Sequence, residues 1–427
     1  MEFHAETYQN EYLTEGATAV DAIVTVTARG AGPSAPASIG PAATEAAVVI
    51  VLDLSGSMRP RYKLVPARRA AVTAIDSLRD GVLFGVVAGT HEARFLYPAT
   101  GLVRATAETR AAAAAAVRDC PTNGGTAIGR WLMEARHRLV ELPGAIRHVI
   151  LLTDGQDESE TREYLEAAVA ECDGVFQCDC RGIGTDWRVD ELRYVATRLM
   201  GSVDIIPDPR DMVADFAAMT ARAMAKRAAD VSQRLWTPRH VELGFVKQVS
   251  PNIDDLTTRA VRVDERTVDL PTGSWAHEQR DYHVHLFVPA HEVGAEMLAG
   301  RVSLVVDGAV VSESLVKAVW TDDVAMSTRI NPHVAHYTGQ VELAAALADG
   351  LEARRAGDDA TATSRLGRAA QLAAESGNDG TLQLLARVVE VEDAASGTVR
   401  LRRNVDAADE MALDTRSSKT VRVRPDG

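Results

Sequence analysis

The spacing of apolar residues changes near residue 228, and this change divides the chain into regions. Between residues 46 and 227, short apolar runs alternate with stretches of helical spacing. This alternation predicts a mostly parallel sheet with helices on both faces, which is an α/β fold. We expect strands at 46–54, 81–89, 147–155, 178–184 and 202–208, with a short antiparallel edge strand at 93–98. We expect helices within 66–78, 106–119, 127–142, 158–172, 188–200 and 209–228.

Residues 228–325 instead carry β-branched and alternating segments separated by turn residues, which predicts a β-sandwich. These segments are 240–250, 259–273, 280–290 and 300–311. Residues 19–28 alternate in the same way but have no second strand beside them in sequence, so we expect them to pair with the later sheet. Residues 30–42 are rich in Gly, Pro, Ser and Ala and mark a linker. The predicted domains are therefore 1–45, with the N-terminal strand and linker, then 46–227 and 228–325.

The last part of the chain is predicted to be helical. Residues 339–358 and 361–377 form an Ala-rich helical hairpin, and 381–393 a third helix, within a helical domain at 330–395. Residues 396–427 have little apolar content and are expected to be a flexible tail. Thr415 and Thr420 stand there among basic residues. They could be phosphorylated and bound by a phosphothreonine reader, or the tail could simply be solvated and unmodified.

Composition and charge exclude several classes of function. The 427 residues are 46% hydrophobic and 25% charged, with a formal net charge of -14. An acidic balance disfavours nucleic acid as the main partner, because phosphate binding needs a basic surface. The longest apolar run, 46–52, is too short to span a bilayer, and the N-terminus lacks the pattern of a secretory signal. We expect a cytoplasmic protein with no membrane partner.

Candidate chemistry follows the first expected strand. Asp53, Ser55 and Ser57 stand at its carboxyl end, where open α/β sheets bind ligands. Thr126 follows two glycines in a later loop, and Asp154 lies at the carboxyl end of the strand expected at 147–155. Two carboxylates and three hydroxyls form an all-oxygen set, which suits a hard divalent cation such as Mg²⁺, or else Mn²⁺ or Ca²⁺.

These motifs resemble the von Willebrand factor type A (vWA) family, whose metal-ion-dependent adhesion site combines D-x-S-x-S with a Thr and an Asp on two further loops. The resemblance covers about 46–227 and implies a Rossmann-like fold. It implies that Ser55, Ser57 and Thr126 contact the metal directly, that Asp53 and Asp154 act largely through water, and that a partner supplies an Asp or Glu. The sandwich and helical hairpin are similar to those of intracellular bacterial members, including proteins of stress-response clusters.

The resemblance implies a metal-dependent protein-interaction module, with a scaffold or regulatory role, rather than an enzyme. Arg59, Arg61 and Lys63 would form a basic rim for an acidic partner, although they could equally be an ordinary solvated helix start. One alternative is a metal-dependent phosphohydrolase that uses Asp53, since 48–57 is similar to the strand-end Asp of haloacid-dehalogenase phosphatases. That family has a second Asp where Ser55 stands here. Another alternative is an adaptor subunit of an ATPase complex, with the nucleotide site on the partner.

Two other groups of potential metal ligands have simpler interpretations. Cys172, Cys178 and Cys180 could hold zinc with Cys120, but C-x5-C-x-C is not a standard zinc spacing, and buried thiols are favoured. His283 and His285 lie on one face of an expected strand, without a nearby carboxylate or Cys pattern that would complete a metal site. We interpret them as satisfied or surface histidines.

Overall fold

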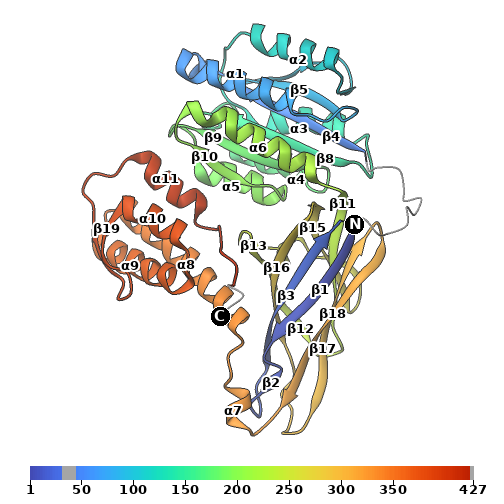
Figure 1. Cartoon of the computed structure of the whole chain (residues 1–427), viewed down its shortest axis with the longest axis vertical. Coiled ribbons are helices and arrows are strands. Elements are labelled where there is room, and N and C mark those ends of the chain that lie inside the picture. Colours follow the sequence, from blue (N-terminus) through green and yellow to red (C-terminus); the bar gives the residue numbers. More distant parts are fainter. Residues whose placement is uncertain (31–44, 424–427) are drawn as a thin grey trace. The chain divides into compact units, whose positions relative to one another are not determined.

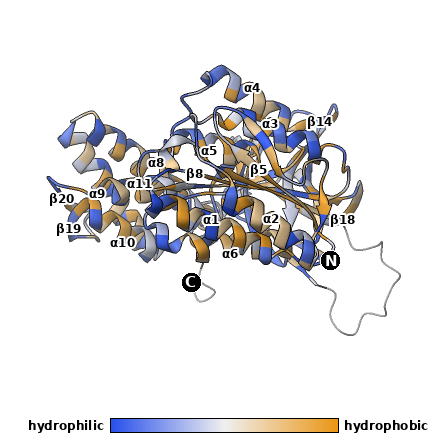
Figure 2. Cartoon of the chain, turned by 90° about the horizontal axis from the view of Figure 1, so that it is seen from above, coloured by the Kyte–Doolittle hydropathy of each residue, from blue (hydrophilic) through white to orange (hydrophobic). Residues whose placement is uncertain are grey.

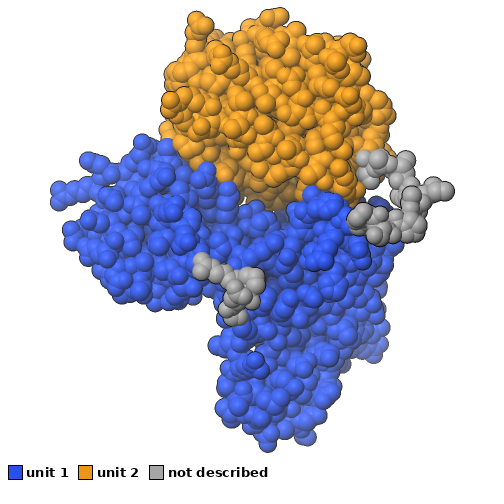
Figure 3. Space-filling view, in the orientation of Figure 1, with its two compact units in different colours: residues 1–36, 230–427 blue, residues 37–229 orange. Residues whose placement is uncertain are grey.

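The computed structural model describes residues 1–30 and 45–423 and divides into two compact units. The split unit combines Met1–Pro36 with Asp230–Gly427, and the α/β unit is Ala37–Ala229 (Figure 3). The α/β unit is therefore inserted between two stretches of chain that fold together. Of the expected linker at 30–42, only Gly30 is within the described residues.

The α/β unit is built on a sheet of order β10-β9-β8-β4-β5-β6, with β7 also paired to β5. Strands β10, β9, β8, β4 and β5 are parallel, and β6 and β7 run antiparallel to β5. All eight residues of β4 are buried, as a β-branched run covered on both faces must be. The strands are β4 (Ala46–Asp53), β5 (Leu83–Gly89), β6 (Ala93–Tyr97), β7 (Val103–Arg104), β8 (Ile146–Thr153), β9 (Gln177–Ile183) and β10 (Val203–Ile206).

Helices cover both faces of this sheet. In Figure 2, α1, α2 and α6 lie on one side of β5 and β8, and α3 and α4 lie on the other. Thr106 and Thr161 accept hydrogen bonds from the first turns of α2 and α4 and so fix where these helices begin. The helices are η1 (Gly56–Met58), α1 (Arg61–Asp76), α2 (Ala107–Asp119), α3 (Ile128–Leu139), α4 (Arg162–Cys172), α5 (Val189–Arg198), η2 (Pro209–Asp211) and α6 (Met212–Ala225). The predicted fold class is confirmed.

The split unit contains two sheets that are antiparallel apart from β2, which runs parallel to β18. Their orders are β1-β3-β16-β12-β13 and β14-β15-β11-β17-β18-β2. Their side chains meet where Phe3 packs edge-on against Trp275, with ring centroids 5.7 Å apart. The strands are β1 (Glu2–Gln9), β2 (Tyr12–Leu13), β3 (Ala19–Arg29), β11 (Ala228–Trp236), β12 (Glu242–Ser250), β13 (Asp254–Asp255), β14 (Val261–Asp264), β15 (Thr267–Trp275), β16 (Glu278–Phe287), β17 (Glu296–Val306) and β18 (Ala309–Trp320). A short helix η3 (Thr257–Arg259) links β13 to β14.

Strand β3 pairs with β16 from the other end of the insertion, so the N-terminal segment belongs to the later sheet (Figure 1). The expectation that no other N-terminal strand lies beside it was wrong. Residues of β1 pair with β3 along its length, from Glu2 opposite Arg29 to Gln9 opposite Ala22. Few β1 side chains are apolar, and only Phe3 and Ala5 among them are buried, so no clear apolar alternation marks this strand in the sequence.

The C-terminal region is a group of helices joined by a small hairpin (Figure 1). It comprises α7 (Val324–Ser327), α8 (Pro332–Arg355), α9 (Asp359–Ser376), α10 (Asp379–Val388), β19 (Val389–Asp393), β20 (Thr398–Leu401) and α11 (Ala407–Arg416). The expected third helix ends at Val388, and the residues after it form a strand paired with β20. Within the described residues, no helix combines the length and the apolar character that crossing a membrane requires.

The prediction of a flexible tail at 396–427 was wrong for the described residues, which end at 423. Val399 and Leu413 are buried in the same core as the helical hairpin, so a few well-placed apolar residues hold this segment. Thr415 is 1% exposed. Thr420 donates its hydroxyl proton to the carbonyl of Val249, 2.7 Å away. Neither threonine stands in the flexible context that the phosphothreonine hypothesis assumed.

Candidate metal centre

Asp53 and Asp154 meet because their strands are neighbours. Parallel strands β4 and β8 pair up to Leu52 and Leu152 and therefore end at the same edge of the sheet. The hydroxyl of Thr153 donates to Asp53 Oδ2 at 2.6 Å and ties the two strand ends together. Thr153 was not singled out as a site residue, although it directly precedes Asp154 in the sequence.

Backbone hydrogen bonds hold the first two loops against each other. Gly56 N donates to Gly124 O at 2.8 Å, and Asn123 N donates to Leu54 O at 2.9 Å. A Cβ atom on Gly56 would lie 3.3 Å from that Gly124 oxygen, which is a tight contact that glycine avoids. Asp53 Oδ1 accepts from Ser55 N at 2.8 Å, which shapes the turn that follows β4.

The hydroxyls gather around Asp154. Ser55 Oγ lies 2.9 Å from Ser57 Oγ, and Ser57 Oγ donates to Asp154 Oδ1 at 2.6 Å. A Cβ atom on Gly155 would lie 2.9 Å from Thr126 Oγ1 and 3.5 Å from Ser57 Oγ, so both hydroxyls flank that glycine. The structure thus brings Asp53, Ser55, Ser57, Thr126 and Asp154 to one place from three loops.

The centre is buried beneath an exposed rim. Asp53 and Asp154 are both 0% exposed, whereas Ser57 is exposed and marks where the cluster meets solvent. Burial raises the pKa of Asp53 to about 6, even though hydrogen bonds from Ser55 and Thr153 favour the charged form. The neighbouring Asp154 contributes to this rise. Two carboxylates buried side by side repel each other, and a nearby cation offsets that repulsion.

The expectation that Lys63 lines an exposed rim was wrong. Its side chain is 9% exposed, and its ammonium lies 2.6 Å from Asp154 Oδ2 and 3.0 Å from Asp186 Oδ2. Burial lowers the pKa of Lys63, but the hydrogen bonds to these two carboxylates outweigh it and raise that pKa overall. Sequence gave no signal for this contact, because Asp186 lies on the loop after β9. Arg59 and Arg61 are exposed, as expected of a rim.

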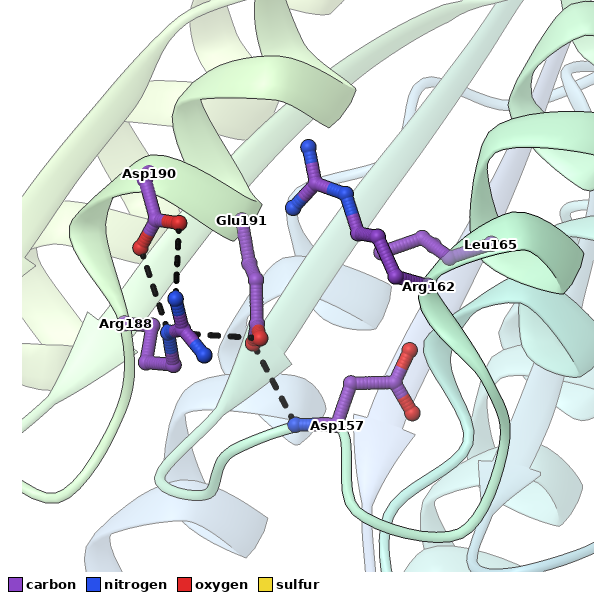
Figure 4. Close-up of a pocket in the computed structure, with 6 residues that line it drawn as sticks. All are labelled: Asp157, Arg162, Leu165, Arg188, Asp190 and Glu191. Carbon is purple, nitrogen blue, oxygen red and sulfur yellow. Dashed lines mark hydrogen bonds and ion pairs between the residues drawn. The ribbon is translucent and has the colours of Figure 1, made fainter.

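A polar hollow of about 300 Å³ lies beside the loop that carries Asp154. It is lined by Asp157, Arg162, Leu165, Arg188, Asp190 and Glu191 (Figure 4). Arg188 pairs with both Asp190 and Glu191, and Glu191 also accepts from the backbone N–H of Asp157 at 3.3 Å. Burial, and then the neighbouring Glu160, raise the pKa of Asp157 to about 9.

The other potential metal ligands do not form a centre. All four cysteines are free and buried, and the Cys178 and Cys180 sulfurs lie 3.8 Å apart. His283 and His285 do have a nearby carboxylate, contrary to expectation, because β3 places Asp21 Oδ1 at 2.7 and 2.9 Å from their rings. Even so, in residues 1–30 and 45–423 no group of three or more His, Cys, Asp or Glu side chains is arranged to hold a metal ion.

Comparison with known families gives two matches in this chain. A model of the von Willebrand factor type A domain matches residues 46–205, and a model of the von Willebrand factor type A C-terminal domain matches residues 371–417. The second match includes residues 396–417, which were expected to belong to a flexible tail. No curated protein matches the chain.

Comparison with solved structures extends the similarity over the whole chain. The ArnB paralog VWA2 from Sulfolobus acidocaldarius shares the fold, with a TM-score of 0.59, 12% identity and 98% of each chain covered. A von Willebrand factor type A protein from Catenulispora acidiphila matches with a TM-score of 0.93 and 48% identity, over 99% of this chain and 97% of that one. From this identity over nearly the full length we conclude that the chain belongs to the von Willebrand factor type A family.

Proposed function

We propose that the chain is a metal-dependent protein-interaction module in which Asp53, Ser55, Ser57, Thr126 and Asp154 hold a hard divalent cation. The α/β unit is a vWA domain, a module that commonly mediates protein–protein interaction. One observation carries the metal dependence. Three loops far apart in sequence bring two fully buried carboxylates and three hydroxyls to one edge of the sheet.

The donor set fits such a cation. Every group is an oxygen, which favours Mg²⁺, with Mn²⁺ or Ca²⁺ as alternatives. Ser57 donates its proton to Asp154 and accepts from Ser55, so one of its lone pairs remains available for a cation. Asp53 is buried with hydrogen-bond donors but without an ion-pair partner among the described residues, so a nearby cation would offset the cost of its charge.

We propose an acidic side chain as the feature recognised on the partner. A bound divalent cation would supply positive charge at the surface opening, where an Asp or Glu carboxylate can approach. Arg59 and Arg61 are exposed beside that opening and add a local positive charge to a chain with a net charge of -14. Such a basic rim would speed the approach of an acidic partner.

A titration with magnesium tests the proposal directly. We expect the wild-type protein to bind Mg²⁺ in a calorimeter and Thr126→Ala to lose most of that affinity, because one hydroxyl ligand is removed. Thr122→Ala is the matched control, since it removes the same atoms from the same loop outside the cluster. Unchanged Mg²⁺ binding by Thr126→Ala would contradict the assignment of ligands.

The role in protein binding needs a second experiment. Wild-type protein and Thr126→Ala are used to capture partners from a cell lysate, with Mg²⁺ and with EDTA. We expect partners that bind the wild type only in Mg²⁺ and that Thr126→Ala does not retain. If the same partners bind both proteins in EDTA, the interaction does not depend on this centre.

A further inference from the structure

Lys63 is the one buried cation found against the proposed metal ligands in the described structure. It lies in the first turn of α1, and its ammonium bonds Asp154 Oδ2 at 2.6 Å. The other oxygen of the same carboxylate, Oδ1, accepts from Ser57 at 2.6 Å. Lys63 therefore contacts Asp154 Oδ2, while Asp154 Oδ1 remains hydrogen-bonded to Ser57.

The charged side chains around Asp154 differ in how far they are exposed to solvent. Asp53, Asp154 and Lys63 are all buried, so water screens their mutual interactions weakly. Asp186, the second partner of Lys63, has a side chain that is 70% exposed. Its negative charge is consequently screened by solvent and compensates Lys63 only in part.

We propose that Lys63 is a built-in counter-cation that weakens the hold of this centre on a divalent cation and strengthens the attraction of that cation for a carboxylate from outside. The inference rests on the proposed function. Its physical basis is that Lys63 offsets one of the two buried carboxylates. The centre can then neutralise less of the charge of a dication, and more positive charge remains to attract a partner's Asp or Glu.

The two effects have opposite signs, and this separates a charge effect from a purely structural role. If Lys63 only oriented Asp154, its removal would weaken cation binding. If its charge dominates, its removal tightens cation binding and lowers the preference for an added carboxylate. In a partly buried site, removing a single charge beside a metal ligand changes the affinity for a dication by on the order of tenfold.

Manganese is a suitable probe, because free Mn²⁺ is measured directly by its electron paramagnetic resonance signal. Full-length wild type, Lys63→Met and Asp186→Asn are titrated with Mn²⁺ at low salt, with and without acetate as the external carboxylate. Arg69→Met is the matched control, since it removes a positive charge from an exposed position of the same helix. Thermal melting shows whether each variant is folded.

We expect Lys63→Met to bind Mn²⁺ about tenfold more tightly than wild type. We expect acetate to strengthen Mn²⁺ binding to wild type more than to Lys63→Met, because acetate and Mn²⁺ binding are linked. Asp186→Asn should weaken Mn²⁺ binding by a few-fold, which keeps the test decisive if Lys63→Met does not fold. Arg69→Met should match wild type.

The results that overturn the inference differ from those that overturn the proposed function. If wild type binds Mn²⁺ and Lys63→Met binds it equally or more weakly, the counter-cation role is wrong and the metal site stands. An Asp186→Asn variant with unchanged or tighter Mn²⁺ binding also contradicts the role of these charges. If wild type itself binds no Mn²⁺, the proposed function fails and this inference fails with it.

Discussion

Asp53→Asn should stabilise the metal-free protein near neutral pH and remove its stabilisation by magnesium. Asp53 is 0% exposed, so a carboxylate there loses its hydration without gaining an ion pair. Asparagine has nearly the same shape, and its oxygen can still accept from Ser55 N. The hydroxyl of Thr153, which now donates to Asp53, can instead accept from the new amide group and turn its proton towards Gly155 O, 3.4 Å away.

The size of the stabilisation expected for Asp53→Asn follows from the pKa of Asp53, which is about 6 in the folded protein against an ordinary value of 3.8. Because the folded-state pKa is raised, protonation stabilises the fold, fully below pH 3.8, and this contribution is lost as the pH rises through about 6. The difference between the two pKa values corresponds to about 3 kcal/mol. At about pH 7.5 the wild type has lost this contribution, whereas a neutral asparagine keeps it.

The assay is thermal unfolding of both proteins in EDTA, at about pH 7.5 and about pH 4. We expect Asp53→Asn to melt at a higher temperature than wild type at the higher pH, and the difference to vanish at the lower pH. With Mg²⁺ at about a thousand times its Kd the order should reverse, because such a ligand adds about 4.1 kcal/mol to the protein that binds it, more than the advantage of Asp53→Asn.

Asp179→Asn is the control for a buried carboxylate on another strand of the same sheet, β9. Burial favours its neutral form, but His148, Arg181 and Ser202 outweigh burial and hold the pKa of Asp179 well below its ordinary value. That substitution should therefore destabilise the protein at about pH 7.5. If Asp53→Asn also destabilises the protein in EDTA at the higher pH, the charge of Asp53 does not destabilise the metal-free fold, and the reasoning is refuted.

Three further outcomes are expected. Gly155→Ala should reduce Mg²⁺ affinity in a calorimetric titration, because its Cβ would lie 2.9 Å from Thr126 Oγ1; unchanged affinity would mean that this hydroxyl is not a ligand. Charge reversal of Arg59 and Arg61 should slow association with any partner captured in Mg²⁺ and reduce its salt dependence, as measured by surface plasmon resonance. Leu413→Ala should cost about 2–5 kcal/mol of stability by leaving a cavity in the helical core, and a melting curve identical to wild type would show that α11 does not pack there.

Local patterns in the sequence were enough to predict the α/β architecture and the position of the centre. A short continuous β-branched run such as β4 is typical of a strand buried on both faces, and such a strand places the residues at its carboxyl end at the sheet edge. The alternation in β3 likewise required a partner strand, and the nearest unused sheet lay beyond the insertion. In both strands, the pattern of apolar residues predicts which faces are buried.

Only the tertiary structure decided which residues contact each charged side chain and each segment with few apolar residues. Lys63 has the sequence context of an exposed helix start, and it is buried because Asp154 and Asp186 converge on it from other loops. The segment after residue 396 is too poor in apolar residues to predict as folded, yet Val399 and Leu413 reach a core built by earlier helices. Burial and ion pairing depend on neighbours that are distant in sequence. A local pattern therefore predicts a helix or a strand, whereas the surrounding structure determines which side chains are buried or paired and whether the segment is ordered.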